Sequence, residues 1–256
     1  RFLNARNTIL ELLKLGVIPI VNENDSVAND EIKFGDNDTL AALVAVLCDA
    51  DLTILLTDID GLYTGNPHID KNAKKIDVVE KITIDIEDMA GAALSNVGTG
   101  GMHTKIEAAK ISTNAGIPMI IASGENPSIL YDMVAGLSVG TLFKATHRPI
   151  HSRKSWILYG SEEEGIIYVD EGAKKALQER GTSLLPSGII NVSGEFERGA
   201  IVAIADIGGN TFGKGISNYS SIFINRIKGL KSNCIYNKYL DYNEEEIIHR
   251  DNLGIL

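Results

Sequence analysis

The first half of the chain alternates between apolar residues at helical spacing and short, continuous apolar runs. Residues 2–15 follow the helical pattern and Gly16 ends it, so a helix is predicted there. The run VIPIV (residues 17–21) ends in a polar cluster, as a buried strand feeding a loop would. A helix and a buried strand are predicted again at about 37–48 and 52–56, and once more at 104–115 and 118–122. Such units predict an α/β fold, a three-layer sandwich in which helices cover both faces of a mainly parallel sheet.

The pattern changes after Gly140. Residues 144–157 carry four basic side chains without an acid, and this basic stretch is interpreted as a solvated hinge rather than a nucleic-acid contact. Short β-type runs punctuated by glycine follow (GIIYVD, GIINVSG, GAIVAIADI and SSIFINRI), and they predict a small all-β domain. The expected organisation is a first domain at residues 1–150, a linker at 151–162, a second domain at 163–241 and a tail at 242–256.

Composition excludes several classes of protein. With 44% hydrophobic residues among 256, the chain can fill a core. No apolar run approaches the length of a membrane helix and no signal segment opens the sequence, so a cytoplasmic protein without membrane contact is expected. The net charge of −10 argues against general nucleic-acid binding, and most of it comes from residues 1–164, which hold 14 Lys/Arg and 23 Asp/Glu. Cys48 and Cys234 have no metal-site spacing and are interpreted as ordinary thiols.

Two predicted strands end in loops that are rich in polar groups, where an open parallel sheet collects its ligands. After the first strand, Asp36, Asn37 and Asp38 open a helix. Capping alone explains Asp36, but three such groups exceed what capping needs, so a functional role for the cluster is favoured. After the second strand, Thr57 and Asp58 are either nucleotide contacts or part of an ordinary turn.

A glycine-rich stretch, GTGGMHTK (residues 98–105), leads into a predicted helix. Its backbone N–H groups and Lys105 could cradle a phosphate, or the stretch could be a flexible loop with a surface lysine, and its residues alone leave both readings open. His103 is interpreted as a spacer rather than a catalytic base. A second stretch, GGNTFGKG (208–215), matches the start of a P-loop, but Gly215 stands where Ser or Thr must bind magnesium and the following residues are β-like. It is predicted to be a hairpin turn.

Several longer stretches resemble the glutamate 5-kinases of the amino-acid kinase family. In the first domain these are PIVNENDSVANDEIKFGDNDTLAAL, LLTDIDGLYTGNP, SNVGTGGMHTKIEAA and SVGTLF. In the second domain, RKSWI, VDEGA, ERGTSLLPSGI, GEFERG and HRDNL resemble the C-terminal PUA domain of that family. The resemblance covers the whole chain, and it implies an amino-acid kinase catalytic domain followed by a β-barrel-like PUA domain.

The resemblance implies an activity and roles for particular residues. ATP, with Mg²⁺, would phosphorylate the side-chain carboxylate of L-glutamate, the first step of proline biosynthesis. Asp25 and Asn37 would bind glutamate, Lys105 would stabilise charge on the transferred phosphoryl group, and Asp38 would orient the basic groups around it. The ATP contacts would be Thr57, Asp58, Thr99, Gly100, Gly101, Met102, His103, Thr104 and Lys105.

Further expectations follow from the same resemblance. Family members open with a strand and a lysine-bearing loop that this sequence lacks, so an N-terminally truncated chain is expected, with an unpaired sheet edge and little activity by itself. Proline would act as a feedback inhibitor through residues 26–34, and the full-length protein would form a homo-oligomer. Two alternatives stay open, an aspartate or acetylglutamate kinase and an RNA-binding role for the PUA domain, although the near-neutral charge of that domain makes RNA a poor partner.

Overall fold

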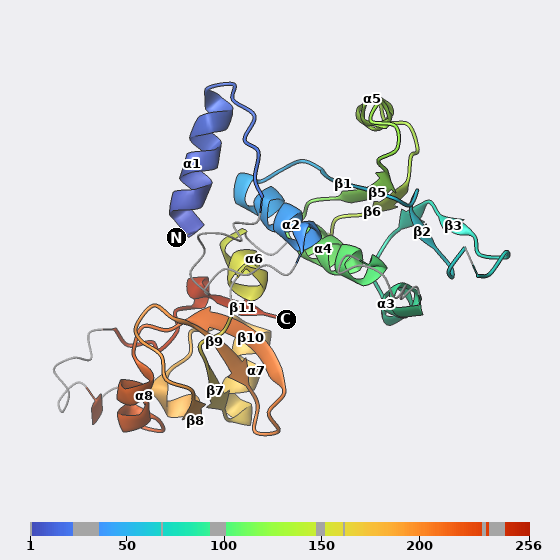
Figure 1. Cartoon of the computed structure of the whole chain (residues 1–256). Coiled ribbons are helices and arrows are strands. Elements are labelled where there is room, and N and C mark those ends of the chain that lie inside the picture. Colours follow the sequence, from blue (N-terminus) through green and yellow to red (C-terminus); the bar gives the residue numbers. More distant parts are fainter. Residues whose placement is uncertain are drawn as a thin grey trace. The chain divides into compact units, whose positions relative to one another are not determined.

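The chain divides into two compact units, Arg1–Ser152 and Arg153–Leu256 (Figure 1). The computed structural model describes residues 2–22, 36–67, 69–92, 101–146, 152–160, 162–231, 234–235 and 244–256. Among the helices of these residues, none combines the length and the apolar character that crossing a membrane requires.

The first unit is built on a four-stranded sheet with the order β1-β5-β6-β4. Strands β1 and β5 are parallel, as are β4 and β6, whereas β5 and β6 are antiparallel. The sheet is therefore mixed but mainly parallel, as predicted. A separate antiparallel hairpin, β2–β3, follows β1 along the chain. The bounds of these strands are β1 Thr53–Thr57, β2 Leu62–Tyr63, β3 Lys75–Ile76, β4 Val78–Val79, β5 Met119–Ser123 and β6 Thr141–Phe143.

Helices cover both faces of this sheet. On one face lie α2 (Asn37–Cys48) and α4 (Met102–Asn114), which pack against each other (Figure 1). The Thr53 hydroxyl of β1 lies 2.9 Å from the Ser112 hydroxyl of α4, which shows the face that α4 covers. On the other face, Met133 of α5 (Ile129–Val134) packs against Ile120 and Ala122 of β5. The predicted three-layer arrangement is confirmed.

Two further helices complete the first unit, α1 (Phe2–Lys14) and α3 (Ile84–Ala92). Arg6 of α1 donates to the Leu47 carbonyl at 2.6 Å and forms an ion pair with Asp49, so it binds the carboxyl end of α2, where a cation is favourable. Burial raises the pKa of the neighbouring Cys48 thiol. The higher pKa leaves less thiolate at neutral pH, which is consistent with an unreactive cysteine.

The prediction of a buried strand at residues 17–21 is wrong. These residues form no strand, and the side chains of Ile18 and Ile20 are 86% and 96% exposed. An apolar run favours burial, but a strand exists only where a neighbouring strand supplies hydrogen-bond partners. Among the described strands, none pairs with this segment.

The second unit contains a five-stranded sheet with the order β11-β10-β9-β7-β8, in which only β7 and β9 pair in parallel. Helix α6 falls inside the segment expected to be a linker, and its Ile157 and Leu158 are buried. The bounds are α6 Ser152–Tyr159, β7 Gly165–Val169, α7 Glu171–Arg180, η1 Pro186–Gly188, β8 Ile189–Ser193, β9 Ile201–Ala205, β10 Thr211–Ile216, α8 Ser221–Ile227, η2 Arg250–Asn252 and β11 Leu253–Ile255.

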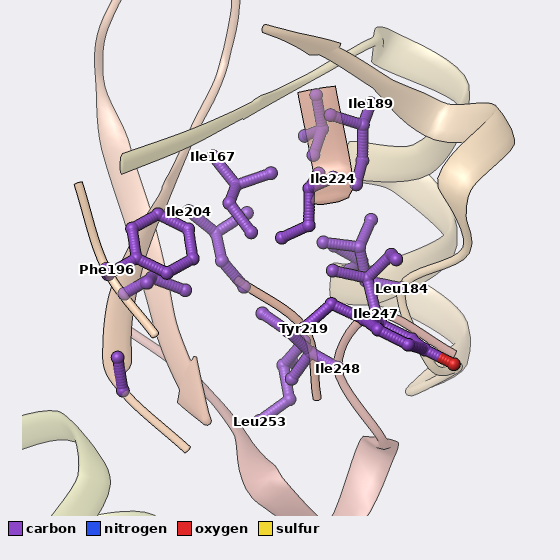
Figure 2. Packing of buried hydrophobic residues seen from close by; sticks show 14 of the residues in the cluster. Ile167, Leu184, Ile189, Phe196, Ile204, Tyr219, Ile224, Ile247, Ile248 and Leu253 are labelled. Atoms are coloured by element: carbon purple, nitrogen blue, oxygen red, sulfur yellow. The ribbon is translucent and has the colours of Figure 1, made fainter. Parts of the chain in front are cut away.

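The core of the second unit is dominated by isoleucine (Figure 2). Ile167 and Ile204 from the sheet and Ile224 from α8 are fully buried there. The prediction that SSIFINRI forms a strand is also wrong, because these residues form helix α8. Its β-branched residues suggested a strand, but Ser220 caps the segment by accepting a hydrogen bond from the Phe223 amide, and Ile224 and Ile227 share the buried helical face.

The stretch GGNTFGKG forms the turn between the antiparallel strands β9 and β10 and most of β10, in agreement with the predicted hairpin turn. Asp206 closes the turn by accepting hydrogen bonds from the Asn210 amide at 3.0 Å and from Lys174 of α7 at 2.7 Å. The Lys174 ammonium also lies 5.6 Å from the centre of the Phe212 ring. The hydrogen bond from Lys174, followed by the bonds from Asn210, lowers the pKa of Asp206 to about 2.

Candidate active site

The carboxyl ends of β1 and β5 lie side by side at one edge of the first unit's sheet. Thr57 and Ser123 end these parallel strands and are register partners, and the Gly124 amide donates to the Thr57 carbonyl at 2.8 Å. In sheets of this kind ligands bind beyond the carboxyl ends of the strands. We therefore expect the predicted site residues to lie at this edge.

Helices α2 and α4 both begin at this edge. Each is joined by a short connection to the strand that follows it, so each runs opposite to the parallel strands. The contact between Thr53 and Ser112 shows that these two residues lie at the same level. Lys105 lies about 10 Å along the helix from Ser112, and Thr57 lies about 13 Å along the strand from Thr53. Lys105 and Thr57 are therefore at nearly the same level, at the carboxyl end of β1.

In the first turn of α2, one carboxylate caps the helix and a second carboxylate does not. Asp36 is the N-cap, and its carboxylate accepts hydrogen bonds from the Thr39 amide at 2.7 Å and the Thr39 hydroxyl at 3.0 Å. Asn37 begins the helix and is exposed. Because Asp36 already caps the helix, Asp38 is available for another role.

Asp38 joins α2 to α4. Its Oδ2 atom accepts a hydrogen bond from the Lys105 ammonium at 3.0 Å, and the same oxygen lies 2.8 Å from the Thr104 hydroxyl. That hydroxyl also lies 2.8 Å from the Gly101 carbonyl, so its single proton serves two acceptors. The side chain of Lys105 is 9% exposed and that of Asp38 is 20% exposed. A carboxylate oxygen on α2 and a buried lysine on α4 thus belong to one polar network.

This arrangement suits an anionic ligand. Gly101 occupies the N-cap position of α4 and has no side chain to cap the first-turn amides. The positive end of a helix attracts phosphate, and Lys105 adds a full charge beside it. Within the GTGGMHTK stretch, Met102 is buried and His103 is exposed. Thr104 and Lys105 belong to the polar network around Asp38.

Thr57, the last residue of β1, and Asp58, the first residue of the loop after it, lie at the same edge. The Thr57 hydroxyl donates to Asp58 Oδ1 at 2.9 Å, and the Asp58 side chain is exposed. Beyond the loop, Tyr63 of β2 donates to Asp60 at 2.9 Å, and this hydrogen bond raises the pKa of the tyrosine. The hairpin that follows is thereby linked to the loop.

Part of the predicted site lies outside the described residues. This part comprises Asp25, Thr99 and Gly100, together with the segment 26–34 that was expected to respond to proline. Among the residues that the structure does describe, no group of three or more His, Cys, Asp or Glu side chains is arranged to hold a metal ion.

One residue near the site escaped the sequence analysis. The Thr141 hydroxyl accepts a hydrogen bond from the Leu62 amide at 2.8 Å and donates to the Ile76 carbonyl at 2.6 Å, and the side chain is fully buried. The only sequence signal was its place in SVGTLF, which contributed to the family resemblance without suggesting a role.

Comparisons with known proteins assign each unit to a family. The first part of the chain, residues 1–123, matches the Amino acid kinase family, and residues 165–237 match the PUA domain. The fold and the site thus define an amino acid kinase joined to a PUA domain. The glutamate 5-kinase of Caldanaerobacter subterraneus subsp. tengcongensis is 50% identical over 100% of this chain and 69% of its own length. That of Carboxydothermus hydrogenoformans is 51% identical over 100% of this chain and 68% of its own length. The chain belongs to the glutamate 5-kinase family.

Among solved structures, the UMP kinase from Bacillus anthracis is 18% identical over 54% of this chain and 50% of its own, with a TM-score of 0.40. This likeness is too partial to support an argument about function. The assignment therefore rests on the sequence relatives.

Proposed function

We propose that this chain transfers the γ-phosphoryl group of ATP to the side-chain carboxylate of L-glutamate, giving L-glutamyl 5-phosphate and ADP, the first step of proline biosynthesis. The observation that carries the proposal is the buried Lys105 ammonium, which Asp38 holds at the start of α4 beside the carboxyl edge of the sheet. Family membership supports the choice of substrate, since the relatives are glutamate 5-kinases.

The reaction asks for positioning and charge rather than for a base. A glutamate carboxylate oxygen forms a bond to the γ-phosphorus while the bond from that phosphorus to the bridging oxygen of ADP breaks, and no proton leaves the nucleophile. Negative charge crosses between two anionic reactants, so the ammonium of Lys105 and the first-turn amides of α4 would stabilise it. In this scheme Lys105 is catalytic and Asp38 fixes its position.

The remaining site residues have proposed roles at the same edge. Asn37, exposed at the start of α2, and Asp25 would bind glutamate, while Thr57 and Asp58 would contact the nucleotide together with residues 99–104. Mg²⁺ would accompany ATP and neutralise charge on the phosphates. Because this ion is usually held by substrate phosphates and one or two carboxylates, a dedicated cluster of protein ligands is not required.

The test uses the full gene product and three acids, L-glutamate, L-aspartate and N-acetyl-L-glutamate. ADP formation and the acyl phosphate trapped by hydroxylamine are measured for each acid. Glutamate should give by far the highest kcat/KM, and a preference for either other acid would overturn the assignment. Lys105→Met should lower kcat by about 10²- to 10³-fold.

The matched control is Lys144→Met. Lys144 also forms an ion pair with a carboxylate, Glu80 at 2.6 Å, but its side chain is 49% exposed and it lies beyond β6. Its replacement should leave kcat within about twofold of the wild-type value, as expected for an exposed pair. Equal losses in the two variants would argue against a special role for Lys105.

Two regulatory properties belong to the same proposal. Proline would inhibit through residues 26–34, and the protein would self-associate with support from the PUA domain rather than bind RNA. Inhibition should disappear when that segment is altered while the KM for ATP is retained. Light scattering would give the oligomeric state, and binding of structured RNA at low salt would contradict the assigned role of the second unit.

A further inference from the structure

A single buried hydroxyl, that of Thr141, joins the hairpin after the β1 loop to the main sheet. It accepts from the Leu62 amide of β2 at 2.8 Å and donates to the Ile76 carbonyl of β3 at 2.6 Å. Leu62 and Ile76 are register partners at the base of the hairpin. One side chain on β6 therefore holds both strands of the hairpin at the same level.

This contact also fixes one end of the loop that carries Asp58. At its first end the loop is fixed by Thr57, whose carbonyl accepts from the Gly124 amide at 2.8 Å. At its second end it is fixed by the bond between Leu62 and Thr141. Only residues 58–61 lie between these two anchors, so the position of Asp58 depends on both of them.

The glycines beside these contacts show how closely the backbone segments approach. Gly61 has φ +151°, and a Cβ atom there would lie 2.6 Å from the Thr141 hydroxyl oxygen. Gly140 has φ +70°, and a Cβ atom there would lie 2.2 Å from the Ile121 carbonyl oxygen. Real side chains do not tolerate such distances. The glycine in TDIDG and the glycine before Thr141 in SVGTLF thus allow the hydroxyl to reach the loop.

We propose that Thr141 is a positioning residue for the nucleotide, acting through the Leu62 amide on the loop of Asp58. The inference rests on the proposed function, because it assigns Thr57 and Asp58 to ATP. It predicts a specific kinetic effect. Removal of the hydroxyl should weaken the binding of ATP and leave the binding of glutamate nearly unchanged, since glutamate is assigned to Asn37 on α2.

The experiment compares Thr141→Val with Thr53→Val in the full gene product. Thr53 is the matched control because it is also buried and its hydroxyl also bonds inside the unit, but it lies at the opposite end of β1 from Asp58. Thr141→Val should raise the KM for ATP by about tenfold, as expected for losing a 1.4 kcal/mol contribution, with the KM for glutamate within twofold. Thr141→Ser, which keeps the hydroxyl, should restore the ATP value.

Three results would overturn the inference. They are an unchanged KM for ATP in a folded Thr141→Val protein, equal increases in the Thr141→Val and Thr53→Val proteins, and failure of Thr141→Ser to restore ATP binding. If Thr141→Val does not fold, hydrogen exchange of the unmodified protein still tests the hydrogen bond between Leu62 and Thr141. The Leu62 amide should exchange far more slowly than the Asp60 amide, and equal rates would contradict the hydrogen bond.

The exchange measurement also separates this inference from the assigned reaction. A protein that phosphorylates none of the three acids would refute the proposed function, whereas the protection of Leu62 and its loss in Thr141→Val would still be measured. Conversely, an active glutamate kinase whose KM for ATP does not change when Thr141 is replaced would refute only the positioning role.

Discussion

Replacing Asp38 and Lys105, singly and together, measures how strongly the candidate site holds its ammonium. The two groups are 3.0 Å apart. Their Coulomb attraction is about 1.4 kcal/mol in water and about 5.5 kcal/mol at an effective dielectric constant of 20. Desolvation offsets much of the larger figure, and Asp38 keeps a fifth of its side-chain surface in contact with solvent. We expect a coupling free energy of about 2 kcal/mol, above the value for exposed pairs and below that for fully buried ones.

The cycle consists of Asp38→Asn, Lys105→Met and the double variant, each unfolded in urea. Asp38→Asn should be the more destabilising single change because it leaves a lysine that is 9% exposed without this carboxylate. The only tryptophan, Trp156, lies in α6 of the second unit. Its fluorescence therefore reports the second unit, whereas hydrogen exchange of α2 and α4 reports the first.

A second cycle supplies the control. Lys144 and Glu80 approach more closely, at 2.6 Å, but their side chains are 49% and 73% exposed. If burial rather than distance sets the strength, their coupling should be no more than about 0.5 kcal/mol. A coupling between Asp38 and Lys105 that is no larger than this would refute the reasoning.

Three further predictions concern the fold. Because hydrogen bonds hold the pKa of Asp206 at about 2, the stability they give the second unit should be present above pH ~4 and lost as the pH falls toward 2; Trp156 fluorescence in urea measures it, and Asp206→Asn should flatten this pH dependence. Gly140→Ala places a Cβ atom against a carbonyl of β5 and should lower the free energy of unfolding of the first unit by about 3 kcal/mol, as measured by hydrogen exchange. Unchanged protection would contradict the steric argument. Ile204→Ala, at a fully buried position, should lower the free energy of unfolding of the second unit by about 3 kcal/mol, whereas Ile222→Ala, at an exposed position, should lower it by less than about 0.5 kcal/mol. Similar losses in the two variants would contradict the assigned core.

Local pattern was sufficient for most elements of the first unit. The helix predicted at about 37–48 is α2 within the same bounds, and the strands predicted at 52–56 and 118–122 are each displaced by one residue. These segments combine a clear period with a well-placed cap or a short apolar run, so the local preference and the tertiary environment agree. The same reasoning failed for residues 17–21 and for SSIFINRI, because apolar and β-branched residues do not reveal whether a strand will find a partner or a serine will cap a helix.

The sequence by itself determined which chemical groups are available: the carboxylates after the first predicted strand, Thr57 and Asp58 after the second, and the lysine of GTGGMHTK. Only the tertiary structure decided how these groups are divided between roles. Asp36 caps α2, whereas Asp38, two residues later, reaches across to Lys105, which is 67 positions away. Thr141 meets Leu62 over an even longer separation. A cap is set by the backbone next to it, but a contact between distant side chains depends on how helices and strands pack, and no local pattern records that packing.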